Sequence, residues 1–372
     1  MHTLRTLLFI AAFWSGSSGA QLQAEKPGIT ALPEPAASWF LVNAHEGSYI
    51  FDAASGEMQG LLSHQWYTPA MAILPSRAEA YYVESFYSRG VRGERQDVLT
   101  VADLTDLSPK TEIDIPDKAA ALWFRHHIGL LADERHLVIF NMTPAQSVSI
   151  VDVVDREFVG EISTPGCAII MPTGERAFMM ICGDGTLQYI ELDADGRETA
   201  RSRSRKFFSV EQDAVFDKPV LTRHGWLLVS FAGQVYEVST SGSSIEIAKP
   251  WSLLAEEDAA GNWRPGGSQP FTVHRDSGLL YALMHQGGVD THHEAGAEVW
   301  VFDAQRRTRV ARMKFETPVD NILTSQEASP SLYTITRQDV VDVYDGLRLR
   351  HLLTIEQPGP KPSLLQTLTP YD

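Results

Sequence analysis

Cysteine is scarce in this 372-residue chain, which contains only Cys167 and Cys182. A metal site would need histidine or further cysteine at short spacing, and none flanks this pair. No Cys-X-X-Cys-His sequence occurs, which excludes a covalently attached c-type haem. The segment between the cysteines has two short apolar stretches, Ala168–Met171 and Ala177–Ile181, separated by a turn. We therefore predict a disulfide that closes a hairpin and stabilises the fold by roughly 3 kcal/mol.

Long hydrophobic runs are missing beyond the first 20 residues, so no membrane-spanning helix is predicted. The beginning of the chain has one charge, Arg5, then an apolar run, Leu7–Trp14, and small residues at Ser18–Ala20. This layout is typical of a secretory signal peptide cleaved after Ala20 or, as the alternative, after Ala24. We expect a signal peptide at 1–20, a flexible segment at 21–38 and one folded domain at 39–372.

Basic residues are fewer than acidic ones: the chain has 31 Lys and Arg and 47 Asp and Glu, which gives a formal net charge of −16. A nucleic-acid backbone requires clustered Lys and Arg, so no nucleic-acid partner is predicted. The acidic balance favours solubility and is compatible with electrostatic steering of a cationic substrate or a basic partner.

Catalytic motifs are absent too: the chain has no G-x-S-x-G elbow, P-loop or dinucleotide fingerprint. The histidine pairs His126-His127 and His292-His293 would point to opposite faces of a strand, so we interpret them as loop or rim residues. The densest set of possible metal ligands is His285, Asp290, His292, His293 and Glu294, a weak signal in a Gly-rich connection. We predict no catalytic residue and no metal site in this chain, as in a scaffold or a binding subunit.

One pattern is present in seven copies: alternating apolar residues, an acidic residue, a turn and a second strand. The acidic residues, spaced by 51, 49, 39, 46, 66 and 42 positions, are Asp52, Asp103, Asp152, Glu191, Glu237, Asp303 and Asp345. A four-stranded propeller blade takes about 40–50 residues. The spacing predicts an all-β, seven-bladed β-propeller of four-stranded antiparallel blades, although six or eight blades are compatible with it. The longest step places an insertion between Pro250 and Pro270, with about two helical turns at Trp251–Ala260.

Two loops interrupt the strand pattern with unusual composition. The first, Ser85–Asp97, contains three Arg and two Gly, and the second, Gly261–Gly267, combines Trp and Arg with turn residues. Exposed Trp and Arg often anchor protein interfaces. The residues that we predict at a subunit interface, with loop packing as an equal alternative, are Arg89, Arg92, Trp263 and Arg264.

At these loops the sequence resembles the large (heavy, or α) subunit of the tryptophan tryptophylquinone-dependent methylamine and aromatic amine dehydrogenases. The matching segments, which span about residue 40 to the end of the chain, are Ser88-Arg89 to Arg95 with Asp97; Cys167 and Cys182 with Pro172-Thr173; Trp263-Arg264-Pro265-Gly266-Gly267; Met284-His285 with Thr291-His292; and Val299–Asp303.

The resemblance implies a periplasmic seven-bladed propeller that pairs with a small (light, or β) subunit in an α2β2 assembly. In that family the small subunit carries the quinone, made from two of its own tryptophans, and the catalytic base. A primary amine becomes an aldehyde and ammonia, and the electrons pass to a blue-copper protein of the amicyanin or azurin type. The resemblance therefore implies that this chain binds no cofactor and that none of its tryptophans is a cofactor precursor.

One connection departs from the family pattern. The large subunit usually contributes an aromatic side chain from an early loop to the mouth of the substrate channel, whereas Val42–Tyr49 contains His45 and no Phe. We place His45 at the channel mouth and leave the amine unassigned. Two rival interpretations are a free-standing periplasmic propeller that serves as a protein-binding scaffold and a propeller hydrolase with a metal ion on its axis.

Overall fold

The computed structural model describes residues 31–65, 70–123 and 125–369. The chain divides into two units, Met1–Ala31 and Leu32–Asp372, and every strand of the described residues lies in the second. The predicted signal peptide, and most of the segment predicted to be flexible, lie outside the described residues. No helix of the described ranges is both long and apolar enough to span a membrane.

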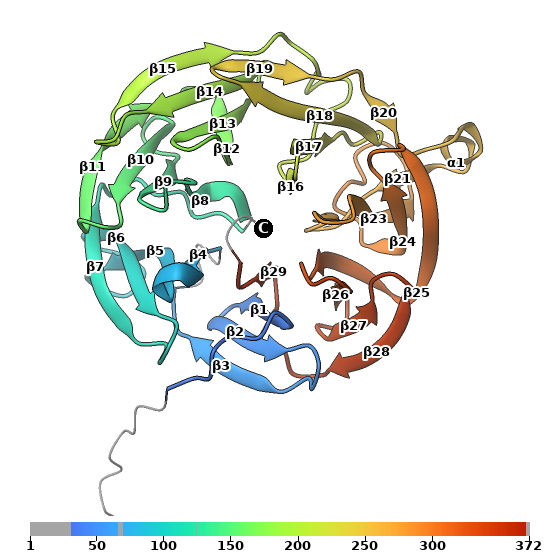
Figure 1. Ribbon diagram of the computed structural model, residues 1–372, viewed down its shortest axis with the longest axis horizontal. Helices are drawn as coiled ribbons and strands as arrows, with labels where there is room; N and C mark the ends of the chain where they lie inside the picture. Colours follow the sequence, from blue (N-terminus) through green and yellow to red (C-terminus); the bar gives the residue numbers. More distant parts are fainter. Residues whose placement is uncertain (1–30, 66–69, 124, 370–372) are drawn as a thin grey trace, which may run out of the picture. The chain divides into compact units, whose positions relative to one another are not determined.

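Within Leu32–Asp372 the strands form antiparallel sheets arranged in a ring (Figure 1). Five sheets have four or five strands: β29 (Leu364–Thr367), β1 (Trp39–Ala44), β2 (Gly47–Asp52) and β3 (Met58–Leu62); β4 (Ala72–Leu74), β5 (Glu79–Tyr87), β6 (Arg95–Asp103) and β7 (Pro109–Ile115); β8 (Ile128–Leu130), β9 (His136–Asn141), β10 (Ser147–Asp152) and β11 (Glu157–Ser163); β12 (Cys167–Thr173), β13 (Ala177–Cys182), β14 (Leu187–Leu192) and β15 (Glu198–Arg203); and β16 (Val220–Thr222), β17 (Gly225–Val229), β18 (Gln234–Ser241) and β19 (Ser244–Ile247), with β20 (Trp251–Ser252) beside β18.

The sixth sheet has eight strands: β21 (Trp263–Pro265), β22 (Phe271–His274), β23 (Leu279–Gln286), β24 (Gly296–Asp303), β25 (Thr308–Thr324), β26 (Ser331–Thr336), β27 (Val341–Asp345) and β28 (Arg350–Ile355). Strand β25 is 17 residues long and pairs with β24 along its first part and with β26 along its last part. The fold is the predicted all-β propeller of four-stranded antiparallel blades. The prediction of seven separate blades is not confirmed. Strand β25 runs without a break from one set of strands into the next, so the two sets form one hydrogen-bonded sheet.

The acidic residue that repeats in the sequence forms the turn between the third and fourth strands. The carboxylates of five of these residues accept a hydrogen bond of 2.7–3.1 Å from the amide two positions later: Asp52, Asp103, Asp152, Asp303 and Asp345. This Asx turn reverses the chain locally, which explains why the residue recurs at the same place. In the fourth sheet Asp193, and not Glu191, makes this turn.

The core lies between neighbouring sheets, because each strand sends alternate side chains to opposite sides. In β1, Leu41 packs with Tyr82 of the following sheet, whereas the ring of Phe40 stacks on Tyr333 of the eight-stranded sheet, with centroids 4.1 Å apart. The C-terminal strand β29 pairs with β1 and becomes the innermost strand of the first sheet. The two ends of the propeller are thus joined in one sheet.

The insertion contains less helix than the sequence predicts. Helix α1 covers only Glu256–Ala260 and projects at the rim of the ring (Figure 1). Trp251 instead pairs with Val235 in β18, and its indole N–H donates to Glu237 at 3.0 Å. Burying this large side chain against the sheet outweighs the local helical pattern, so the prediction for Trp251–Ala260 was wrong in its first half.

Candidate subunit-docking face

The loops that carry the sequence signals lie on one face of the propeller. In an antiparallel meander, successive connections alternate between the two ends of the strands. The connections between second and third strands therefore share one face with those from one sheet to the next. We call this the loop face; its connections include 45–46, 88–94, 142–146, 183–186, 230–233, 248–270 and 287–295.

The hairpin of β5 and β6 presents two of the predicted interface residues. Arg89 and Arg92 are exposed on the tip, with Val91 between them 80% exposed. The tip is held by its own backbone, since the amide of Ser88 donates to Glu94 at 2.9 Å and that of Arg89 to Arg92 at 3.0 Å. An ordered hairpin with exposed Val and Arg has the composition of an interface anchor.

The base of the same hairpin has a structural role. Arg95 donates to both carboxylate oxygens of Asp97, at 2.7 and 2.6 Å, and to the carbonyl of Ala119 at 2.9 Å. Asp97 is fully buried and also accepts from the amide of Ala119. A bidentate pair of this kind is geometrically specific. It fixes the angle at which the hairpin leaves the ring.

Trp263 and Arg264 lie in β21, which pairs with β23, and both side chains are half-buried. The ring of Trp263 lies 5.1 Å from the buried ring of Trp300, so packing is one role of this residue. The following Gly267 has a φ of +129°, and a Cβ on it would lie 2.8 Å from the carbonyl oxygen of Asp320. Only glycine fits this close approach without strain.

His45 lies at a recess of about 540 Å³ on the loop face. The structure brings two residues to it that sequence reasoning missed, Glu84 and Phe86 of β5. Both precede the loop signal by a few positions, and nothing in the sequence links them to the turn that contains His45. The recess beside His45 therefore contains an aromatic ring, that of Phe86, which a neighbouring sheet supplies.

Buried ionisable groups line the same recess. Burial raises the pKa of Glu84, whose carboxylate accepts from the amide of Gln65 at 3.0 Å and from the hydroxyl of Thr100 at 2.5 Å. Burial lowers the pKa of His64, whose Nε2 shares a hydrogen bond of 2.7 Å with Ser48. The wall thus contains a buried carboxyl group and a buried imidazole, and burial disfavours the charged form of each.

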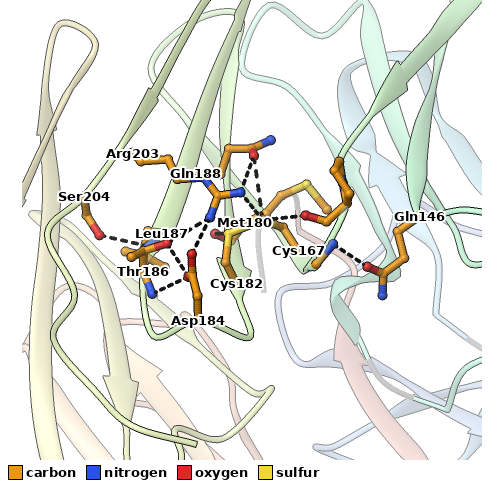
Figure 2. Close-up of a disulfide and its surroundings, with 12 residues drawn as sticks. Gln146, Cys167, Met180, Cys182, Asp184, Thr186, Leu187, Gln188, Arg203 and Ser204 are labelled. Atoms are coloured by element: carbon orange, nitrogen blue, oxygen red, sulfur yellow. Dashed lines mark hydrogen bonds and ion pairs between the residues drawn. A yellow bond between two sulfur atoms is a disulfide. The ribbon is translucent and has the colours of Figure 1, made fainter.

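The predicted disulfide is present between Cys167 of β12 and Cys182 of β13, which are directly paired residues. Figure 2 shows Arg203 reaching across it, with Nη1 2.9 Å from Asp184 and Nη2 3.4 Å from the sulfur of Cys167. On the other side, the amide of Gly166 donates to Gln146, in the connection between β9 and β10, at 2.6 Å. The disulfide therefore fixes the loop-face end of this hairpin.

In the parts of the chain that the structure describes, no three His, Cys, Asp or Glu side chains lie close enough to hold an ion. His292 stacks on Phe231 at 3.8 Å between ring centroids, and burial lowers its pKa. His126 and His127 lie in a connection, as one of the two predicted alternatives has it, but they are buried, so their interpretation as rim residues was wrong. They lie in a 3₁₀ turn, Arg125–His127, that leads into the innermost strand β8.

The class of protein that the fold and the loop face define is a β-propeller scaffold with elaborated loops on one face. Comparison with known proteins identifies the family: residues 36–369 match the model of the methylamine dehydrogenase heavy chain (MADH). The heavy chain of Methylophilus methylotrophus methylamine dehydrogenase is 27% identical over 85% of this chain and 78% of its own length. That of Paracoccus versutus is 25% identical over 93% and 83%. Hydrazine synthase of Kuenenia stuttgartiensis shares the fold, with a TM-score of 0.56 and 14% identity over 88% of this chain and 98% of its own.

The chain belongs to the methylamine dehydrogenase heavy chain family. It is accordingly a subunit of an amine dehydrogenase, which is an oxidoreductase.

Proposed function

We propose that this chain is the large, cofactor-free subunit of a periplasmic quinoprotein amine dehydrogenase and forms an α2β2 heterotetramer with a small subunit. The match to the heavy-chain family over residues 36–369 carries the proposal. The signal-like sequence before Ala20 supports export to the periplasm. The tryptophan tryptophylquinone that accepts the amine's electrons would reside in the small subunit.

Three tryptophans of this chain have structural roles that are compatible with that division, because their indole N–H groups are engaged within the fold. Trp226 donates to the carbonyl of Pro172 at 3.0 Å, Trp251 to Glu237 at 3.0 Å and Trp300 to Glu298 at 2.7 Å. All three side chains are buried and belong to the core.

We further infer that the eight-stranded sheet acts as two blades, so that the ring has seven. Two Asx turns, at Asp303 and Asp345, support this inference, because each ends the third strand of a four-stranded set. The first part of β25 would then be the outermost strand of one blade, and its last part would be the innermost strand of the next.

In the proposed reaction a primary amine is oxidised to an aldehyde and ammonia, with water supplying the aldehyde oxygen. The electron pair leaves the assembly one electron at a time to a blue-copper protein of the amicyanin or azurin type. The proposed role of this chain is to bind the small subunit and to guide the amine substrate. His45, Glu46, Glu84 and Phe86 form an acidic and aromatic mouth that suits a substrate which is an ammonium ion in water.

We propose that the small subunit docks on the loop face, with Arg89, Val91 and Arg92 at the contact and Trp263 and Arg264 beside it. Exposed charges at the rim steer association, and the exposed apolar residue gains free energy when it is covered.

The test is to purify the tagged chain from its native periplasm and record a visible spectrum with and without a primary amine. The proposal predicts a co-purifying small chain and a quinone band that bleaches with amine. A lone, colourless propeller from cells grown on amines would instead support the scaffold interpretation.

The docking site is tested separately with Val91→Asp. We expect at least tenfold weaker association with the small subunit and an unchanged thermal midpoint of the large subunit, because Val91 makes few contacts within the fold. The matched control is Val310→Asp, since Val310 is 55% exposed on β25 outside the loop face. Equal affinity of the two variants would remove the hairpin from the interface.

A further inference from the structure

A hollow of about 250 Å³ lies on the loop face between two neighbouring sheets of the ring, that of β4–β7 and that of β8–β11 (Figure 1). The hairpin of β5 and β6 contributes Tyr87 and Val91 to its walls. The connection from β7 to β8 contributes Ala119–Ala121, and the connection from β9 to β10 contributes Met142. We call this space the alanine pocket.

The exposed part of the pocket wall is largely apolar. Val91 is 80% exposed and Met142 is 42% exposed, whereas Ala119 and Ala120 are buried. Three consecutive alanines have only methyl groups to place in this space, so it stays open. Apolar surface in contact with water gains free energy when another apolar group covers it, and the pocket therefore suits an apolar side chain of a partner.

Hydrogen bonds join the three connections, so the pocket takes its shape without a partner. Arg95, the one charged residue of the described wall, donates to both carboxylate oxygens of Asp97 and to the carbonyl of Ala119 at 2.9 Å. Its charge is thus neutralised within the hairpin. The amide of Met142 donates to the carbonyl of Lys118, in the connection from β7 to β8, at 3.1 Å. A preformed pocket avoids the free-energy cost of ordering loops on binding.

Strand β5 separates the alanine pocket from the recess beside His45. Tyr87 lines the alanine pocket, whereas Phe86, its neighbour in the strand, lines the recess. Adjacent side chains of a strand point to opposite sides, which explains why one strand serves both spaces. A partner held in the alanine pocket would therefore lie against the same hairpin that forms a wall of the proposed substrate mouth.

We propose that the alanine pocket receives one large apolar side chain of the small subunit and anchors that interface. The inference rests on the proposed function, in which the small subunit docks on the loop face. The chain belongs to a heavy-chain family, which implies a light-chain partner. Arg89 and Arg92 outnumber Glu94 on the exposed hairpin tip beside the pocket, so the anchor has a carboxylate near it on the small subunit. Side chains that fill pockets in this way supply most of the binding free energy of an interface.

The pocket can be filled from the large subunit itself. Ala121→Phe places a ring in the pocket from an exposed position, so it should weaken association with the small subunit about tenfold or more and leave the thermal midpoint of the large subunit unchanged. Dissociation of the purified complex on dilution measures the affinity. The matched control is Ala54→Phe, the same change at an exposed alanine between β2 and β3, outside the loop face. Equal affinity of the two variants would overturn the pocket as the anchor and leave the proposed subunit association in place.

Photo-crosslinking identifies the occupant of the pocket. With p-benzoylphenylalanine in place of Met142, irradiation of the complex should link the large chain to an apolar residue of the small subunit that has Asp or Glu within a few positions. A link to a second large subunit or to a blue-copper protein, or no link in a complex that contains the small chain, would overturn this inference alone. If no small chain co-purifies with the wild type, the proposed function fails and the inference fails with it. Should Ala121→Phe fail to fold, the crosslink decides.

Discussion

The side chain of Gln366 and the backbone of Met71 exchange two hydrogen bonds across the boundary between the first two sheets. Nε2 of Gln366 donates to the carbonyl of Met71 at 2.9 Å, and the amide of Met71 donates to Oε1 at 3.0 Å. Gln269 makes the same reciprocal pair with the backbone of Leu365, at 3.0 and 2.9 Å. The C-terminal strand is thus joined to its neighbours on both sides by glutamine amides, in addition to its pairing with β1.

Gln366→Ala should therefore destabilise the ring at its closure. The substitution leaves the buried amide and carbonyl of Met71 without partners, which costs about 2–4 kcal/mol for the two groups together. Urea unfolding of the large subunit measures the loss. Gln338→Ala, at an exposed glutamine, is the control and should change the free energy of unfolding by less than about 0.5 kcal/mol. Equal stability of the two variants would show that these hydrogen bonds do not hold the closure.

Removing the disulfide should lower stability without changing the fold. The two cysteines are 15 residues apart, and opening a loop of this size costs about 3 kcal/mol. The double substitution Cys167→Ala and Cys182→Ala, followed by urea unfolding, gives the value. Reductant should bring the wild-type protein to the same midpoint and leave the double variant unaffected. A variant as stable as the oxidised wild type would contradict the expectation.

Asp152 should contribute a stability that depends on pH. Burial alone would raise the pKa of this carboxyl, but the amides of Asp155 and Val154 and the guanidinium of Arg135 together hold it below its usual value. A lowered pKa in the folded state means stabilisation above about pH 4, which disappears as pH falls through the folded value. Asp152→Asn keeps the turn acceptor but removes the titration.

The thermal midpoint of Asp152→Asn should accordingly lie below that of the wild type at pH 7, and the difference should vanish as pH falls through the folded pKa of Asp152. Asp195→Asn, at an exposed turn position, provides the comparison. A gap between Asp152→Asn and the wild type that stays constant as pH falls would indicate a loss of hydrogen bonding and not of charge.

The variant Glu84→Gln tests the effect of the Glu84 carboxylate on stability separately from its effect on the attraction of a cationic substrate. The pKa of Glu84 is raised by burial, so the folded protein favours the protonated form, and the carboxyl adds most to stability below its folded pKa and less as pH rises through it. A neutral glutamine should leave stability at pH 7 unchanged or slightly higher. In the complex, at a pH above the folded pKa of Glu84, we expect a several-fold higher KM for a cationic amine, because the recess then loses a negative charge. Glu57→Gln, at an exposed position outside the recess, should change neither quantity. An unchanged KM for Glu84→Gln would place the substrate route elsewhere.

The parts of the fold that could be predicted are those set by neighbouring residues. Alternating apolar residues gave the strands, and the hairpin between Cys167 and Cys182 is present as predicted. The repeated aspartates marked turns because a carboxylate and an amide two residues later need nothing else to form a hydrogen bond. The pattern was less reliable at Glu191 and Glu237, where the longer side chain does not make this turn. The carboxylate of Glu237 instead accepts hydrogen bonds from Trp251 and Arg307.

The site depended on distances that the sequence does not contain. Arg89 and Arg92 could be placed on an exposed loop, because their surroundings in sequence are turn residues. The meeting of His45 with Phe86, and the burial of His126, require the ring to close and its sheets to take their places. The sequence also did not predict that two sets of strands are joined through β25, because continuous pairing depends on the angle between two neighbouring sheets.

By itself the sequence determined that this is a β-propeller of antiparallel strands, with one disulfide and a heavy-chain family signature in its loops. Those features rest on periodicity, turn chemistry and short segments of local order. Only the tertiary structure decided which side chains share the recess beside His45, and that Gln269 and Gln366 secure the last strand. Such contacts join residues up to 323 positions apart, and they form only when the hydrophobic faces between sheets are buried around a closed ring.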